Sequence, residues 1–279
     1  MMDHLLKFWH GYVLAPYVLT WIACAIVFLV VRRWLHFRGH AKRRDAQIAA
    51  LTPLAQRLGG KVLGPGEAGM WTAELCKPFV NEFSIAFRSK RQFDLSLDFQ
   101  RGQWHVRVTE ASIRYDSRGF GVRWLQEHRI EIATARLAPL KVRRPNKYSI
   151  NNGQPLSPGQ LESEWKSIVE HKPATVQSDA EWLPVPLSPP MDKEFSAYGN
   201  DPATAARELN FDALHWLIDQ QESLPLWAKR MTLTFESGFV YLIAYDHIYP
   251  DDLMGVVDTI CGLLDRMPGA RPRHPAAAV

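Results

Sequence analysis

The feature that most constrains the fold of this chain is an uncharged run near its start, the twenty residues from Tyr12 to Val31. A helix rises about 1.5 Å per residue, so a helix over this run would be about 30 Å long, the thickness of the hydrocarbon core of a bilayer. A cleaved signal peptide would have a shorter apolar core, a basic segment before it and a small-residue cleavage site after it. Here the basic residues follow the run. We therefore predict a retained transmembrane helix, residues 12–34, after a short external segment, residues 1–11.

The basic residues beside this run predict its orientation. Lys7 precedes the run, whereas six Lys and Arg residues follow it before the next acid, Asp45. Positively charged flanks stay on the cytoplasmic side of a membrane, so we predict an external N-terminus, a single span and a cytoplasmic location for the remainder. Cys76 and Cys261 would then be ordinary reduced thiols.

The same basic residues are predicted to contact anionic lipid headgroups, where each charge contributes about 1 kcal/mol. The predicted contact residues are Arg32, Arg33, Arg38, Lys42, Arg43 and Arg44 beside the run, and Arg143, Arg144 and Lys147 further along the chain. For these last three, pairing with acids of the C-terminal half is the alternative. His36 and His40 are spaced like two metal ligands on one helix face, but the neighbouring cations oppose a bound dication, so we predict no metal there.

The distribution of charge argues against a nucleic-acid partner. The chain has 33 Lys and Arg and 29 Asp and Glu, and its isoelectric point is about 9.0. Residues 45–147 contain 17 basic and 10 acidic residues, whereas residues 148–279 contain 9 and 18. The part after the basic cluster is therefore net negative, whereas a DNA-binding domain is basic in its own right. With 47% hydrophobic and 22% charged residues, the composition is that of a folded globular chain.

Alternating apolar and polar residues predict an antiparallel sheet in the first half of the soluble part. In Phe93 to Phe99 and in Trp104 to Val108, every second side chain is apolar. This period of two is typical of strands that pack on one face and leave the other face polar. Further strands are predicted over residues 83–87, 119–124, 129–136 and 140–143.

The C-terminal part alternates predicted strands and helices. A strand over residues 195–198 is followed by Asp201-Pro202, a strong helix start because the acid caps the helix and proline suits its first turn. A second helix is predicted over residues 210–221, and then a hairpin over residues 231–245 that turns at Ser237-Gly238. Residues 250–267 form an amphipathic helix in this reading.

These elements predict an α+β fold in which an N-terminal transmembrane helix and a helical stalk precede a mainly antiparallel sheet packed against two or three C-terminal helices. The helix-favouring stalk ends at Gly59-Gly60 and is broken or kinked at Pro53. Pro186 and Pro189, in a proline-rich stretch, belong either to a stiff connector or to a polyproline ligand for a partner. The predicted boundaries are 35–60 for the basic stalk, 61–144 for the β-rich part, 145–192 for the proline-rich connector, 193–268 for the α+β part and 269–279 for a disordered tail.

The last hundred residues contain the pattern Phe195-x-x-Tyr198-x-x-Asp201-Pro202-x-x-Ala205, a helix up to Ile218 and the hairpin Met231–Tyr245. In this pattern, and in having an anchor followed by a stalk, the chain resembles a family of uncharacterised bacterial membrane-anchored proteins with a cytoplasmic α+β domain. The resemblance covers about a third of the chain. It implies the cytoplasmic (inner) membrane of a bacterium and no catalytic residue; many members have two spans, whereas this chain offers one.

A search for catalytic and metal-binding motifs identifies no signature. The sequence lacks HExxH, CxxC, P-loop, GxSxG and HxE motifs, so we predict no catalytic, metal-binding or cofactor-binding residues. Candidate acid–base pairs are Glu162/Glu164, Asp251/Asp252 and Asp246/His247. The pair Asp251/Asp252 is explained by the start of a helix, where negative charge is favourable. Asp246-His247 follows an apolar strand, a place where active sites occur.

Two functions from different classes follow. In the first, the chain is a membrane-anchored interaction or scaffold module that binds a protein or lipid partner. In the second, it is a membrane-tethered hydrolase or other enzyme with a site near Tyr245–His247. A pocket that holds several convergent titratable groups would favour the enzyme, and a filled core with a flat or grooved surface would favour the module.

Overall fold

The computed structural model of the protein describes residues 14–79, 90–117, 121–144, 157, 159–160 and 182–274. The chain divides into two compact units, residues 1–47 and residues 48–279. Helix α2 (Leu14–Arg57) supplies the described part of the first unit. Its residues from Tyr17 to Leu35 are exposed, and it is the one helix in the described chain that is long and apolar enough to cross a membrane.

The end of α2 belongs to the second unit and lies in its core. Leu51, Leu54 and Ala55 are buried there. Of the two alternatives predicted at Pro53, a break or a kink, the break is absent, because the helix continues through Pro53 to Arg57. Gly59 has a φ of 64°, and the next amide donates to the carbonyl of Ala55 (2.8 Å). A left-handed glycine that closes a helix in this way is a common C-terminal cap, as the sequence predicts.

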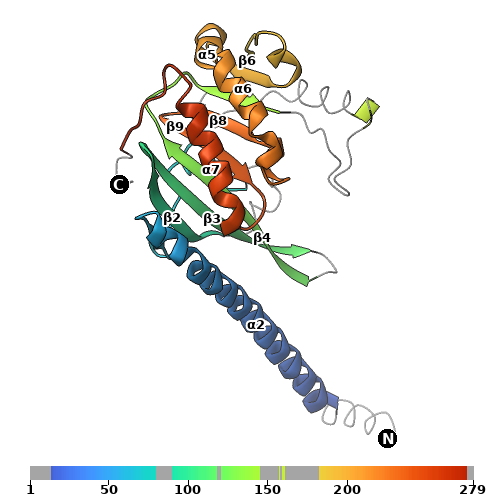
Figure 1. The fold of residues 1–279 in the computed structure, drawn as a ribbon. Coiled ribbons are helices and arrows are strands. Elements are labelled where there is room, and N and C mark those ends of the chain that lie inside the picture. Colours follow the sequence, from blue (N-terminus) through green and yellow to red (C-terminus); the bar gives the residue numbers. More distant parts are fainter. Residues whose placement is uncertain are drawn as a thin grey trace, which may run out of the picture. The chain divides into compact units, whose positions relative to one another are not determined.

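In the described part of the second unit, nine strands form one antiparallel sheet in the order β1-β2-β3-β4-β9-β8-β5-β7-β6 (Figure 1). Their bounds are β1 (Lys61–Leu63), β2 (Arg91–Arg101), β3 (Trp104–Ser117), β4 (Gly121–Ala133), β5 (Leu140–Arg143), β6 (Leu183–Pro184), β7 (Ser196–Gly199), β8 (Thr232–Glu236) and β9 (Phe239–Ala244). Because β5 lies between β8 and β7, strands from both halves of the sequence build one sheet.

Strand β4 combines two segments that the sequence predicts as separate strands. The described residues 121–124 and 129–133 of the segments predicted over 119–124 and 129–136 belong to one strand, β4. In it the intervening polar residues pair with β3, Gln126 with Ser112 and His128 with Glu110. The polar residues between the two apolar segments make the sequence resemble two separate strands, although these residues are paired with β3. The strand predicted over residues 83–87 lies outside the described residues.

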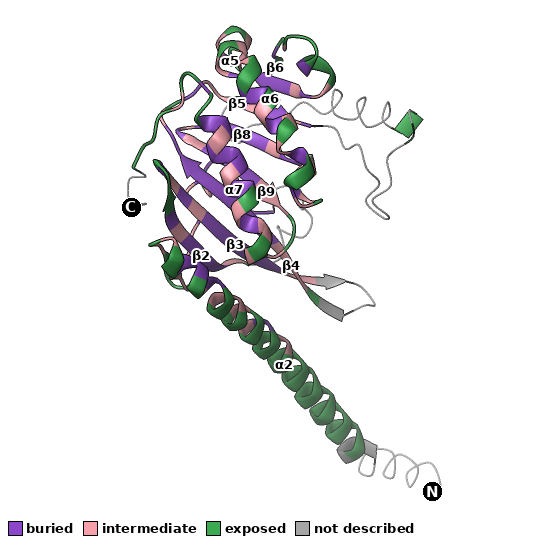
Figure 2. Ribbon diagram, in the orientation of Figure 1, coloured by how far each residue is buried: buried purple, intermediate pink, exposed green. Residues whose placement is uncertain are grey.

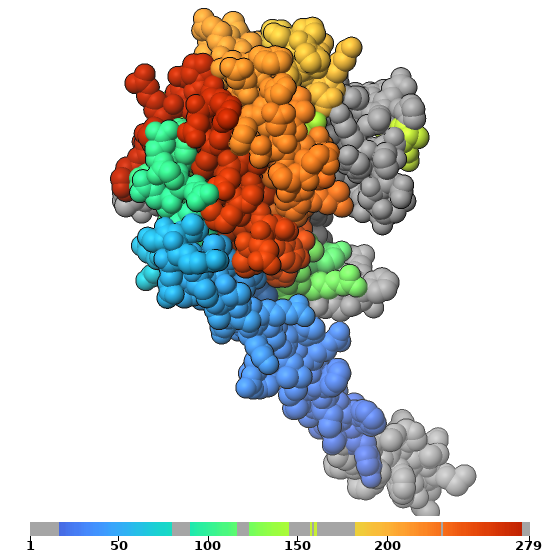
Figure 3. Space-filling model, in the orientation of Figure 1, coloured from blue at the N-terminus to red at the C-terminus, as the bar shows by residue number. Residues whose placement is uncertain are grey.

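One face of the sheet is apolar and is covered by helices (Figures 1 and 3). These are α5 (Pro202–Glu208), α6 (Phe211–Asp219) and α7 (Pro250–Leu264), with short 3-10 turns η1 (Met191–Lys193), η2 (Gln221–Ser223) and η3 (Ala228–Arg230) between elements. The predicted caps are present, since Asp201 accepts from the amide of Thr204 (3.1 Å) and Asn210 from that of Ala213 (2.8 Å). The α+β class, with an antiparallel sheet against C-terminal helices, is confirmed.

The opposite face carries many polar side chains beside a small apolar cluster that includes Phe79, Ala111 and Ile113, and on strands β2 to β4 it is buried (Figure 2). Residues 69–79, here called the strap, lie over it, and Arg129 and Glu131 below the strap have no solvent exposure. The prediction that these strands pack on one face only is therefore wrong. The strap contains little secondary structure and few alternating residues, so the sequence pattern did not identify it as a covering layer.

Candidate functional site

The loop after β9 brings the predicted pair Asp246 and His247 together with a carboxylate from β3. His247 Nδ1 lies 3.1 Å from Oε1 of Glu110, and the amide of Ile248 donates to Oε2 of the same carboxylate (3.1 Å). Glu110 is 2% exposed, whereas the His247 side chain is 34% exposed. The imidazole is thus oriented by a buried carboxylate and remains accessible from one side.

A second histidine, His128, also holds this loop in position. His128, on β4, donates from Nδ1 to the backbone carbonyl of Asp246 (2.8 Å), and its ring meets that of Trp227 edge-on at a centroid distance of 5.0 Å. Burial lowers the pKa of His128, although the Asp246 carbonyl and nearby carboxylates oppose this shift. The ring is therefore neutral at neutral pH and acts as a support for the loop.

This cluster has part of the arrangement that acid–base catalysis uses. An imidazole oriented by a carboxylate can accept or release a proton near neutral pH. The side chain of Asp246 is occupied locally, because its Oδ1 accepts from the amide of His247 (2.8 Å) and from the hydroxyl of Tyr249 (3.2 Å). Glu110 also holds the backbone amide of Ile248 just before α7, so the same contacts fix the position of a helix.

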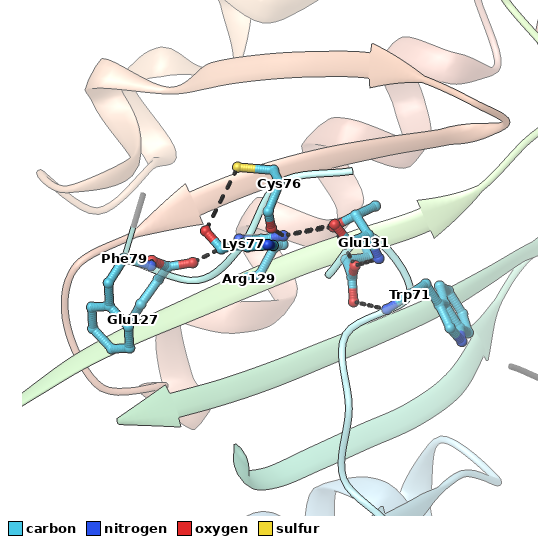
Figure 4. A network of polar contacts seen from close by, with 8 residues as sticks. Trp71, Cys76, Lys77, Phe79, Glu127, Arg129 and Glu131 are labelled. Carbon is cyan, nitrogen blue, oxygen red and sulfur yellow. Dashed lines mark hydrogen bonds and ion pairs between the residues drawn. The ribbon is translucent and has the colours of Figure 1, made fainter. Parts of the chain in front are cut away.

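A larger polar cluster joins the strap to β4 (Figure 4). Both oxygens of Glu131 accept from the strap, Oε1 from the amide and hydroxyl of Thr72 (2.7 Å each) and Oε2 from the amide of Trp71 (3.1 Å). The amide of Phe79 donates to Glu127. Two carboxylates four residues apart on one face of β4 therefore hold the strap at Trp71-Thr72 and at Phe79.

Arg129 lies between these carboxylates. Its Nη2 donates to Glu127 (2.8 Å), and its Nη1 donates to the Thr72 hydroxyl and the Cys76 carbonyl (2.8 Å each). The guanidinium also lies over the ring of Tyr241, 5.6 Å from its centroid. Burial lowers the pKa of Arg129, but Glu127 and Glu131 raise it by more, so the cation persists. Each residue of the cluster has at least one structural partner, although Nε of Arg129 is buried without a hydrogen bond.

An open groove of about 570 Å³ lies between the β2–β3 turn and α7. Its charged groups are already paired: Arg101 makes two bonds to Asp258 (2.6 and 2.9 Å), and Asp265 accepts from the Trp104 indole (2.9 Å). The guanidinium of Arg266 lies 4.0 Å from the ring of Trp216. The groove is thus a shallow surface with satisfied polar groups.

The predicted headgroup residues fall into different environments. Arg32, Arg33, Arg38, Lys42 and Arg43 are exposed on α2, and Arg44 pairs with Asp45 (3.1 Å). Further along the chain, Arg143 is half-buried on β5 and Lys147 lies outside the described residues. Arg144 is buried, bonds Glu194 (2.9 Å) and lies over the Phe195 ring, which is the predicted alternative of pairing with the C-terminal half. The Arg144 side chain is thus 6% exposed and engaged in an ion pair within the module.

The remaining candidates are dispersed. Asp251 and Asp252 occupy the first turn of α7, His215 pairs with Asp219 on α6 (3.0 Å), and Glu162 and Glu164 lie outside the described residues. Within the described chain, no group of three or more His, Cys, Asp or Glu side chains is placed to hold a metal ion.

Sequence reasoning missed Glu110, although a signal was present. Glu110 continues the apolar phase of Trp104, Val106 and Val108, so its side chain had to point toward the core. A charged residue in an apolar phase is a reason to look for a buried partner. Its partner His247 is 137 residues away, and no local pattern could connect the two.

The sequence matches no protein-family model, and comparison with curated proteins and with solved structures likewise gives no significant match.

Proposed function

We propose that this chain is a single-pass membrane protein whose folded part is a cytoplasmic interaction module for a protein or lipid partner. One observation carries the proposal: α2 has an exposed apolar surface from Tyr17 to Leu35, and the basic residues follow it directly. A water-exposed helix of this composition would be unfavourable by about 25 cal/mol per Å² of apolar surface, a cost that a bilayer removes. A bacterial inner membrane with anionic lipids is the environment that the sequence suggests.

The basic end of α2 suits the cytoplasmic interface. The guanidinium of Arg38 lies 4.9 Å from the Trp34 ring, and that of Arg33 lies 5.8 Å from the Phe37 ring. Aromatic rings and arginines at the same level of a helix match the interfacial region of a bilayer. This supports an external N-terminus and a cytoplasmic module.

A topology experiment tests this part of the proposal. Alkaline phosphatase or a fluorescent protein fused after Val279 should give cytoplasmic fluorescence and no periplasmic phosphatase activity. The chain should also remain in the membrane fraction after alkaline carbonate extraction. Extraction of the full chain into the soluble fraction, or periplasmic activity of the fusion, would contradict the proposal.

An enzyme with a site at Tyr245–His247 is a second candidate, and the oriented, partly exposed imidazole of His247 favours it. The module is preferred because Glu110 and Asp246 both serve to position the backbone of the loop. A panel of ester, phosphoester and amide substrates separates the two. His215→Gln is a matched control, since His215 is also an exposed histidine paired with a carboxylate.

For a module, the wild-type chain and the His247→Gln and His215→Gln variants should show the same background turnover. Turnover by the wild-type chain that His247→Gln abolishes and His215→Gln retains would establish the enzyme instead.

A further inference from the structure

The hairpin of β3 and β4 extends beyond the rest of the sheet (Figures 1 and 2). Pairing with β2 ends at Ile113, and pairing with β9 begins only at His128. Beyond these limits, the described residues of β3 and β4 are paired in the sheet only with each other, from Arg114 opposite Trp124 to Ser117 opposite Gly121. Isolated two-stranded ribbons are marginally stable in water, so a ribbon of this kind gains from a surface on which to lie.

The side chains of this ribbon combine arginines with aromatic rings on both faces. Opposed residues of an antiparallel pair share a face, so Arg114 lies on one face with Trp124, and Tyr115 lies on the other with Arg123. Arg123 is exposed and the other three are half-buried. Each face therefore has one arginine and one aromatic residue at the same height along the ribbon, and the Nε1 atom of Trp124 is buried.

This combination matches the interfacial region of an anionic bilayer. Tyr and Trp rings concentrate at the level of the headgroups, where an apolar ring and a polar tip are both accommodated. Arginine can keep its charge among the phosphates while its methylenes lie on apolar surface. Near a negative surface, each such charge contributes about fivefold to binding.

A nucleic acid is the competing partner for a basic two-stranded ribbon, since such a ribbon can enter a major groove. The overall charge of the module opposes it, because residues 45–279 contain 26 basic and 28 acidic residues and so have no net positive charge. A nucleic acid bound to the ribbon would also lie close to the rest of the module. A bilayer surface would need to contact only the projecting ribbon.

We infer that the β3–β4 ribbon is a second membrane contact, in which Arg114, Tyr115, Arg123 and Trp124 dock on anionic lipid headgroups. The inference rests on the proposed membrane anchoring of α2. It adds a contact that neither the basic cluster of α2 nor the predicted residues on β5 provide.

The full chain in nanodiscs provides the test. An environment-sensitive fluorophore is attached at Ser117→Cys, near the end of the described ribbon, after the native residues Cys24, Cys76 and Cys261 have been changed to alanine. In nanodiscs with about one third anionic lipid, we expect blue-shifted emission that is lost in neutral nanodiscs and at high salt. Neutralising two charges by Arg114→Gln with Arg123→Gln should lower the ratio of docked to free ribbon about 25-fold.

Controls separate docking from folding and from anchoring. Arg136→Gln with Arg207→Gln removes two exposed arginines outside the ribbon and should leave the emission unchanged. Equal melting temperatures of the variants show that the module is intact, and Arg123→Gln alone serves if the double change unfolds it. Loss of the whole chain from the nanodiscs contradicts the proposed anchoring.

Three outcomes would overturn the inference while the anchoring stands. One is a ribbon probe that stays water-exposed in both lipid compositions. Another is a blue shift that is lost in the control variant Arg136→Gln with Arg207→Gln as fully as in the ribbon variant. The third is a response to added duplex DNA in place of anionic lipid.

Discussion

The two faces of the sheet are built from the same alternation of residues but are held in different ways. The face toward α6 and α7 buries aliphatic side chains such as Leu97, Ile130 and Val240. The face under the strap buries Glu127, Arg129 and Glu131, which bond a segment with little regular structure. Apolar packing is non-directional and tolerates small shifts, whereas a buried ionic network requires each partner in place. Alternation of apolar and polar residues along a strand thus indicates that the sheet has two different faces. It does not tell whether the polar face is exposed to solvent or buried.

The largest expected effect comes from removing the cation of the polar face. Arg129→Ala leaves Glu127 and Glu131 buried without their positive partner, which should cost about 3–5 kcal/mol of unfolding free energy. Urea unfolding of the module measures this loss. The matched control is Arg101→Ala, whose pair with Asp258 is exposed and should contribute less than about 1 kcal/mol.

A triple variant sharpens the comparison further. Replacing Glu127, Arg129 and Glu131 together by Leu, Met and Leu would be nearly neutral if the ions only satisfied one another. The carboxylates also accept strap amides, so we expect the triple variant to remain destabilised and its strap to become sensitive to protease. Recovery of wild-type stability would contradict this account of the polar face.

On the helix-covered face, Gly262 in α7 leaves little space for a larger side chain. A Cβ at Gly262 would lie 2.7 Å from ring atoms of Trp216, so Gly262→Ala must displace the indole and should cost about 1–3 kcal/mol. The Trp216 indole also donates to the carbonyl of Thr259 (3.0 Å), which limits its movement. The melting temperature and near-ultraviolet circular dichroism report this change. A variant as stable as the wild type would show that the helix layer yields more easily than the geometry indicates.

One polar residue on the apolar face should make stability depend on pH. Burial lowers the pKa of His128 from its ordinary value of 6.5, so below pH 6.5 the unfolded chain binds a proton that the folded chain does not. Stability therefore falls as pH decreases from 6.5 toward the lower folded pKa, by at most about 1.4 kcal/mol per pH unit. His128→Asn should remove this part of the slope. An identical pH profile in the variant would assign the slope to other groups.

The smallest expected effect has the opposite sign and occurs on the same helix as Gly262. Gly255 is exposed, and a Cβ there meets nothing within 4 Å. Gly255→Ala should therefore stabilise the module by about 0.4–1 kcal/mol, because alanine loses less backbone entropy in a helix. Thermal unfolding of the two glycine variants side by side distinguishes packing from helix propensity.

Much of the fold was predictable from local signals. The helix starts at Asp201 and Asn210, the turn at Ser237-Gly238 and the alternation in β2 and β3 each depend on neighbouring residues, and the structure contains all of them. The strap was not predictable, because its order comes from hydrogen bonds to strands that lie about 50 to 60 residues later in the chain.

The candidate site shows the same limit. Asp246-His247 was identified as a pair because the two residues are adjacent and follow an apolar strand. Glu110 and His128 complete the cluster, but they come from strands more than a hundred residues earlier. Their proximity depends on β9 pairing with β4, which no local pattern specifies.

The strand order also determines when the sheet can close as the chain emerges from a ribosome. β2, β3 and β4 can pair as soon as they are made, but the other edge of β4 must wait for β9, about 100 residues later. At typical rates of synthesis this delay is roughly 5–20 s. β5 likewise lacks both of its neighbours until β7, and later β8, have been made. The nascent chain therefore carries an open strand edge for seconds, and such an edge can pair with a strand of another chain and lead to aggregation.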